Sequence, residues 1–299
     1  MVHSGRSDIW EEPGAGVTIW GMSPRAWSRA LAVVLAVLAA VTLGGPAGAS
    51  APGFPPPVVD RIGPGVQLVT HGVRCTAAFA FRDRAGRSFL GYAARCASPA
   101  GLRAVDGCRH RSWPLGTQVR VASDAVGNHR GRTLARGVLR YSSWLAMHRA
   151  GTHDRLACRN NDFALVQVLG RASSRVSPTL DFWDGPDAMG TVPDAGNRLL
   201  GCSGQVVSGV RTLLPGALHV RQAWRWGAAV SRATGLGSDV GAGLVDERGR
   251  AAGILLADHA GRRTRVASLG PLVRFAQRHG MPGLVLLPGR SPFHAYVVV

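Results

Sequence analysis

The sequence contains no lysine, and all 35 of its permanently basic residues are arginine. A bias in nucleotide composition is sufficient to remove lysine, because arginine codons are rich in G and C. Such a bias does not explain the formal net charge of +18, which results from 35 basic and 17 acidic residues. An excess of this size indicates either a strongly solvated surface or an attraction to anionic partners.

The sequence also lacks the motifs of common metal sites. No two of its five cysteines stand in a C-x-x-C spacing, and no histidines form an H-E-x-x-H motif. We therefore expect neither a metal site nor a cofactor. Five cysteines are instead consistent with disulfides, which persist outside the reducing cytosol.

No apolar run reaches the about 18–20 residues that a membrane-spanning helix needs. The run Ala30–Leu43 is shorter, follows Arg25 and Arg29, and precedes the small residues Ala47-Gly48-Ala49. This order of basic, apolar and small residues is typical of a secretory signal peptide. We expect cleavage after Ala49, export of a chain that begins at Ser50, and no stable membrane span.

The arginines gather in three short clusters. The clusters are Arg103–Arg111; Arg130, Arg132, Arg136 and Arg140; and Arg262, Arg263 and Arg265. A solvated surface is the plainer interpretation, and attraction to an acidic wall polymer, anionic lipid or DNA is the alternative. None of the clusters has interleaved aromatic residues or matches a nucleic-acid-binding module, so the sequence contains no specific nucleic-acid motif.

Short segments of alternating apolar residues, separated by turn residues, predict an all-β protein. The first set is Cys75–Phe81, Ser88–Ala93, Gln118–Ala122, Leu134–Tyr141 and Asp162–Val168. The second set is Gln205–Val210, Ala217–Arg221, Ala228–Ser231, Gly243–Asp246, Ala251–Ala257 and Thr264–Ala267. Two sets of this size, with a break at 181–197, predict two antiparallel β-barrels side by side.

One helix is expected after the second set of strands. Ser268 is a candidate N-cap, apolar residues then recur at three- and four-residue steps, and Gly280 is a stop signal. The expected division of the chain is a signal peptide at 1–49, a Pro/Gly-rich leader at 50–73, a first barrel at 74–180, a linker at 181–197, a second barrel at 198–267, a helix at 268–280 and a tail at 281–299.

Four segments, in order along the chain, resemble secreted trypsin-like serine proteases of the actinobacterial type. They are Cys75-Thr76-Ala77-Ala78-Phe79, Gly91–Cys96, Asn161–Val166 and Ser238–Leu255. The resemblance extends from about Arg74 to Gly280. It implies two antiparallel barrels of the six-stranded type, a C-terminal helix, and a cleft at the interface of the barrels.

The resemblance also assigns the catalytic positions, and two of the three are substituted. Asp162 occupies the position of the triad aspartate, Arg95 that of the histidine and Val240 that of the serine, while Ser238 and Asp239 fall in the oxyanion loop. Valine has no proton to lose, and arginine stays protonated and cannot act as a base. We therefore expect a catalytically inactive homologue that binds a peptide, a protein or an anionic cell-surface polymer.

The resemblance implies a disulfide between Cys75 and Cys96, on either side of Arg95. We expect Cys108 and Cys158 to form a second disulfide, which leaves Cys202 free.

A buried carboxylate without its histidine is costly unless another group pairs with it. We therefore predict an ion pair between Arg95 and Asp162, provided that Arg95 points inward.

Two other functions stay open at this point. One is an active endopeptidase with an unrecognised constellation, in which Ser238 or one of His71, His110, His129, His148 and His153 takes part. The other is a cell-surface protein that binds polyanions through its arginine clusters.

Overall fold

The computed structural model describes residues 61–123, 130–181, 183–207, 210–213, 218–231, 239–257 and 264–294. The chain divides into a unit at Met1–Gly53 and a unit at Phe54–Val299, and all described residues belong to the second. The predicted signal peptide, Ser238, Arg262 and Arg263 lie outside the described residues, as does the side chain of Cys202. Within the described ranges, no helix is long and apolar enough to cross a membrane.

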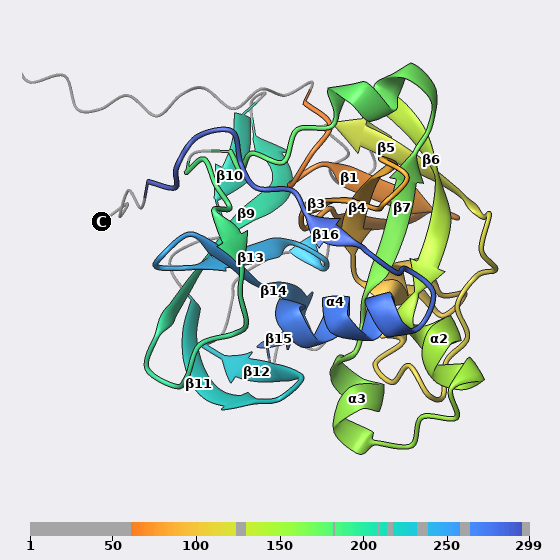
Figure 1. Ribbon diagram of the computed structural model, residues 1–299, viewed down its shortest axis with the longest axis vertical. Coiled ribbons are helices and arrows are strands. Elements are labelled where there is room, and N and C mark those ends of the chain that lie inside the picture. Colours follow the sequence, from red (N-terminus) through yellow and green to blue (C-terminus); the bar gives the residue numbers. More distant parts are fainter. Residues whose placement is uncertain are drawn as a thin grey trace, which may run out of the picture. The chain divides into compact units, whose positions relative to one another are not determined.

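The first sheet has eight strands in the order β16-β3-β4-β7-β6-β5-β1-β2 (Figure 1). The strands are β1 Gln67–Thr70, β2 Val73–Thr76, β3 Ala80–Arg82, β4 Ser88–Tyr92, β5 Gln118–Ser123, β6 Arg132–Ser142, β7 Ala164–Val168 and β16 Val285–Leu286. Between β2 and β3, the N–H of Ala77 donates to the carbonyl of Val66, and the N–H of Ala78 donates to that of Gly91. These bonds join the β1 side of the sheet to the β4 side, so the sheet closes around its apolar interior.

The second sheet contains a closed ring of six antiparallel strands. Its strands are β9 Arg198–Val207, β10 Val210–Leu213, β11 Leu218–Trp224, β12 Gly227–Val230, β13 Gly243–Asp246, β14 Arg250–Ala257 and β15 Thr264–Ser268. The order is β10-β9-β11-β12-β15-β14-β13, and β13 pairs back with β9 to close the ring. Its interior is filled by buried aliphatic side chains that include Leu199, Val220, Leu244, Leu255 and Val266.

Among the described residues, three α-helices and three 3₁₀ helices lie outside the strands. They are α2 Ser143–Arg149, α3 Arg155–Asn160, α4 Leu269–Arg278, η1 Ala94–Ala97, η2 Gly101–Arg103 and η3 Gly170–Arg175. Helix α4 corresponds to the predicted helix, and its Phe275 packs edge-on against Trp226 with 6.0 Å between ring centroids. Ser268 precedes α4, but its hydroxyl accepts a hydrogen bond from the N–H of Val192 and does not cap the helix.

The two-barrel, trypsin-like all-β architecture with a C-terminal helix is as predicted, but several boundaries differ. Strand β1 lies inside the expected leader at 50–73, β8 (Ala188–Met189) lies inside the expected linker, and β16 lies inside the expected tail. The expected strand at Cys75–Phe81 is divided between β2 and β3. These short segments become strands by pairing with neighbours distant in sequence, and two to four residues carry too little periodicity to predict them. Helices α2 and α3 have only seven and six residues, which is too short for a helical period to be recognised in the sequence.

Candidate functional site

Arg95 lies on the single-turn helix η1, directly after β4. Its side chain is 1% exposed, so the guanidinium points into the protein. The adjacent Cys96 forms a disulfide with Cys75 of β2, as predicted. This bond ties η1 to the neighbouring strand.

Asp162 lies between α3 and β7, and Ser143 at the start of α2 fixes the backbone on both sides of it. The Ser143 hydroxyl donates to the carbonyl of Asn161 at 2.6 Å and accepts from the N–H of Phe163 at 3.0 Å. Ser143 and Asp162 are both buried. Sequence reasoning missed Ser143, because a serine after a predicted strand has no feature that indicates this contact.

Arg95 and Asp162 form a buried ion pair with two hydrogen bonds. The guanidinium Nε of Arg95 donates to Oδ2 of Asp162 at 2.5 Å, and the backbone N–H of Arg95 donates to Oδ1 at 2.9 Å. The two side chains are 1% and 2% exposed. This geometry confirms the predicted pairing. Both oxygens of the Asp162 carboxylate therefore accept hydrogen bonds from Arg95. Arginine is already protonated and cannot take up a further proton.

Val240 lies in a tight turn just before β13 and is itself buried. Its carbonyl accepts from the N–H of Thr76 at 2.9 Å. The next residue, Gly241, has a φ of +95°, and a Cβ there would lie 2.5 Å from the Thr76 carbonyl oxygen and 3.3 Å from the Ala93 nitrogen. Only glycine fits this close approach. The turn of Val240 therefore packs against the segment that leads into Arg95.

The neighbouring oxyanion-loop positions are only partly described. Asp239 is buried, and its carbonyl accepts from the N–H of Ala242 at 2.9 Å, which closes the turn around Val240. Ser238 lies outside the described residues. The roles that the family resemblance gives to these two residues stay predictions.

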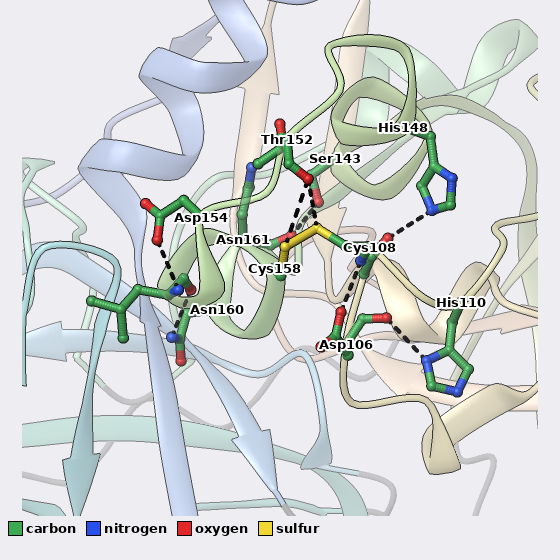
Figure 2. The surroundings of a disulfide bond; sticks show 12 residues. Asp106, Cys108, His110, Ser143, His148, Thr152, Asp154, Cys158, Asn160 and Asn161 are labelled. Carbon is green, nitrogen blue, oxygen red and sulfur yellow. Dashed lines mark hydrogen bonds between the residues drawn. A yellow bond between two sulfur atoms is a disulfide. The ribbon is translucent and has the colours of Figure 1, made fainter.

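The second predicted disulfide, Cys108–Cys158, joins the loop after η2 to helix α3 (Figure 2). The N–H of Gly107 also donates to the carbonyl of Cys158 at 2.7 Å. Asp106 accepts from the N–H of Cys108 at 3.0 Å, and the Thr152 carbonyl lies 3.3 Å from the Cys108 sulfur. Because α3 ends directly before Asp162, this anchoring also helps to hold the carboxylate in place.

Asp106, Cys108 and Cys158 form the one group of three potential metal-ligating residues found among the described residues, with ligand atoms within 4.8 Å of one another. Both sulfurs belong to the disulfide, so neither is available as a thiolate. The arrangement is a structural crosslink.

The described histidines make contacts other than a triad. His148 Nε2 lies 2.9 Å from the carbonyl of Gly107, and His110 Nδ1 lies 3.0 Å from that of Asp106. His71 packs against Trp113 with 4.2 Å between ring centroids. His153 is exposed, and His129 lies outside the described residues. Among the residues that the structure describes, no histidine hydrogen-bonds to Asp162.

No protein-family model matches the sequence, and no curated protein sequence matches it either. Solved structures of bacterial proteases do align with it. Protease A of Thermobifida fusca is 14% identical at a TM-score of 0.44, and the match covers 76% of this chain and 98% of that one. The Nocardiopsis protease is 17% identical at a TM-score of 0.41, with 75% and 97% covered. The chymotrypsin of Cellulomonas bogoriensis is 13% identical at a TM-score of 0.43, with 76% and 97% covered.

Proposed function

We propose that this protein is a secreted, catalytically inactive homologue of trypsin-like serine proteases that acts as a binding protein. The observation that carries the proposal is the buried pair of Arg95 and Asp162. In an active site of this kind, the aspartate orients a histidine, and the histidine takes the proton of the nucleophile. Here both oxygens of the carboxylate accept from Arg95 instead.

The nucleophile position supports the same conclusion. Val240 is buried and has no hydroxyl, so it offers neither a proton nor a lone pair to a substrate carbonyl. In subtilisin, loss of the serine or of the histidine alone lowers kcat by about 10⁶-fold. Both groups are absent from the corresponding positions of this chain.

The packing around these positions is nevertheless retained. An uncompensated buried carboxylate costs several kcal/mol or becomes protonated, and the guanidinium of Arg95 removes that cost by pairing. Gly241 keeps the close approach between the Val240 turn and Thr76. The packing around Arg95, Asp162 and Val240 is ordered, although the groups that catalysis needs are missing. This combination favours a protein that uses its surface for binding. We propose a peptide or protein segment as the occupant of the former cleft.

Secretion is supported by two independent features. Residues 25–49 have the order of basic, apolar and small residues that predicts a signal peptide, and the protein contains two disulfides. Disulfides of this kind persist in oxidising compartments.

An assay with peptide and ester substrates tests the catalytic part of the proposal. We expect hydrolysis by the native protein to equal that of a Ser238→Ala variant, because no nucleophile acts in either. Hydrolysis by the native protein that the Ser238→Ala change abolishes would contradict the proposal and support an active endopeptidase with a non-standard site.

Photo-crosslinking tests the binding part. Peptides selected from a random library against the native protein, and carrying a photoreactive group, should label the exposed residues that border segments 76–79, 92–95 and 240–243, because these segments are themselves buried. Labels confined to other surfaces would show that the former cleft is not the binding site.

A further inference from the structure

Three arginines lie in one row across the outer wall of the first barrel. Val69 of β1 lies directly opposite Arg74 of β2 on one side and Arg120 of β5 on the other. Arg120 in turn lies directly opposite Arg136 of β6. Residues directly opposite one another in antiparallel strands project from the same face of the sheet. Figure 1 shows β1, β5 and β6 side by side in this wall.

The positive charge continues along β6. Arg130 precedes the strand, and Arg132, Arg136 and Arg140 lie on it; all four are exposed. Arg136 and Arg140 are about 13 Å apart at the rise of an extended strand, and neighbouring strands are about 5 Å apart. We call Arg74, Arg120, Arg130, Arg136 and Arg140 the arginine face.

The four strands that carry these arginines have no acidic side chain of their own. Strands β1, β2, β5 and β6 have no aspartate or glutamate in their sequences. Within the described ranges, no carboxylate forms an ion pair with Arg130, Arg136 or Arg140. Burial lowers the pKa of Arg120, and the positive charges of Arg130 and Arg74 lower it further.

Like charges directly opposite one another in a sheet are destabilising. The pairing of Arg120 with Arg136 is therefore unfavourable in the free protein, and a bound anion would relieve it. If these arginines served only to keep the surface solvated, two of them would not need to lie directly opposite one another.

The chemistry of the face restricts the kind of anion. The large apolar residues that are exposed in the described part of the chain are Val105, Leu115, Leu156, Leu169, Met189 and Val285. None belongs to these four strands, and only Leu169, next to Arg136, and Leu115, near Arg140, border the face. The aromatic residue on them, Tyr141, is buried. Protein interfaces generally use aromatic and apolar anchors, and membrane-surface elements insert apolar side chains. The face offers charge and guanidinium hydrogen bonds, which match phosphate groups.

We propose that the arginine face binds a linear phosphate polymer, which follows the row of arginines on β5 and β6 and contacts them through its phosphates. The proposal does not depend on whether the protein is catalytically active. A flexible polymer with closely spaced phosphates can reach guanidinium groups that lie about 5–13 Å apart across and along the strands.

Binding of inorganic polyphosphate to the purified protein, measured at several salt concentrations, tests this proposal. The test variant is Arg130→Gln/Arg136→Gln/Arg140→Gln. The matched control is Arg221→Gln/Arg248→Gln/Arg290→Gln, which removes the same charge from exposed arginines outside the arginine face. We expect the native protein and the control to bind with a similar slope of log affinity against log salt. The test variant should bind at least tenfold more weakly at low salt, with a slope reduced by about 0.7 per arginine removed.

Equal losses in the two triple variants would overturn the proposal, because the attraction would then depend on net charge alone. Absence of polyphosphate binding by the native protein would also overturn it.

Two further probes identify the phosphate source, namely duplex DNA and vesicles of phosphatidylglycerol mixed with phosphatidylcholine. Stronger binding to the vesicles than to polyphosphate, lost in the test variant, would assign the face to a membrane and reject the polymer. Thermal unfolding of both variants at or above the temperature of the native protein excludes loss of fold as the cause.

Discussion

At the scale of single residues, Arg95 is the most informative side chain in the molecule. A guanidinium that is 1% exposed must be paired, and its Nε is paired with Asp162 at 2.5 Å. The carboxylate of Asp162 also accepts from the backbone N–H of Arg95 in η1. It therefore orders the backbone after β4 as well as the side chain of Arg95. The residues that the family resemblance assigns to catalytic positions therefore hold the structure together in this protein.

Removal of one member of the pair should destabilise the protein strongly. We expect Arg95→Ala to lower the free energy of unfolding by about 3–5 kcal/mol, because it leaves Asp162 buried without its cation. Adding Asp162→Asn should recover part of that loss, because the amide is neutral. Denaturant unfolding of the single and double variants measures both effects.

Arg198→Ala is a suitable control for this series. Arg198 pairs with Glu247, but both side chains are 42% exposed, and exposed ion pairs contribute only about 0–1 kcal/mol. If Arg95→Ala were no more destabilising than Arg198→Ala, the buried pair would not have the structural importance assigned to it.

At the scale of elements, the two barrels contain the same five-residue turn. Asp83–Arg87 joins β3 to β4, and Asp246–Arg250 joins β13 to β14, each with the pattern Asp-x-x-Gly-Arg. In each turn the aspartate Oδ1 accepts from the backbone N–H groups two and four residues later, and the arginine Nε donates to Oδ2 at 2.7 Å. The aspartate thus fixes each hairpin through three donors.

The pH dependence of stability should report on the first of these turns. Burial of Asp83 raises its pKa, but the hydrogen bonds and positive charge of Arg87 and the N–H of Ala85 outweigh burial and place the pKa below its ordinary value of 3.8. A lowered folded pKa gives stability that is fully present above 3.8 and is lost as the pH falls through the folded value. Asp83→Asn should therefore be less stable than the native protein at pH 7, with the difference shrinking in acid.

Unfolding curves at several pH values between 2 and 7 measure this difference. The exposed Asp194, replaced by Asn, provides the control and should change stability little at any pH. A difference for Asp83→Asn that stayed constant down to pH 2 would contradict the assigned role of the carboxylate.

How much of each element could be predicted depends on its length and its partners. Strand β13 was predicted at its observed bounds, and β4 and β5 to within one residue, because their alternation extends over four to six residues. Strands β8 and β16 have two residues each, and only pairing with β14 and β3 makes them strands. A sequence pattern contains no information about such distant partners.

At the scale of the whole molecule, the candidate site is assembled from three segments that are far apart in sequence. The segments around Arg95 and Asp162 belong to the first barrel, and the turn of Val240 belongs to the second. The hydrogen bond from Thr76 to Val240 joins the barrels directly at this point. The family resemblance pointed to these three segments, and the ion pair of Arg95 with Asp162 was predicted from their charges. The contacts of Ser143 and Gly241 could not, because they depend on how the barrels pack.

Labelling with a serine-reactive phosphonate, followed by intact mass and peptide mapping, tests the central claim of catalytic inactivity most directly. The native protein should stay unlabelled, because Val240 cannot form the covalent adduct and Arg95 cannot act as a base. The variant Arg95→His/Val240→Ser, which replaces both lost groups, should become labelled at position 240. Stoichiometric labelling of the native protein at a single serine would contradict the account and establish an active enzyme with a non-standard site.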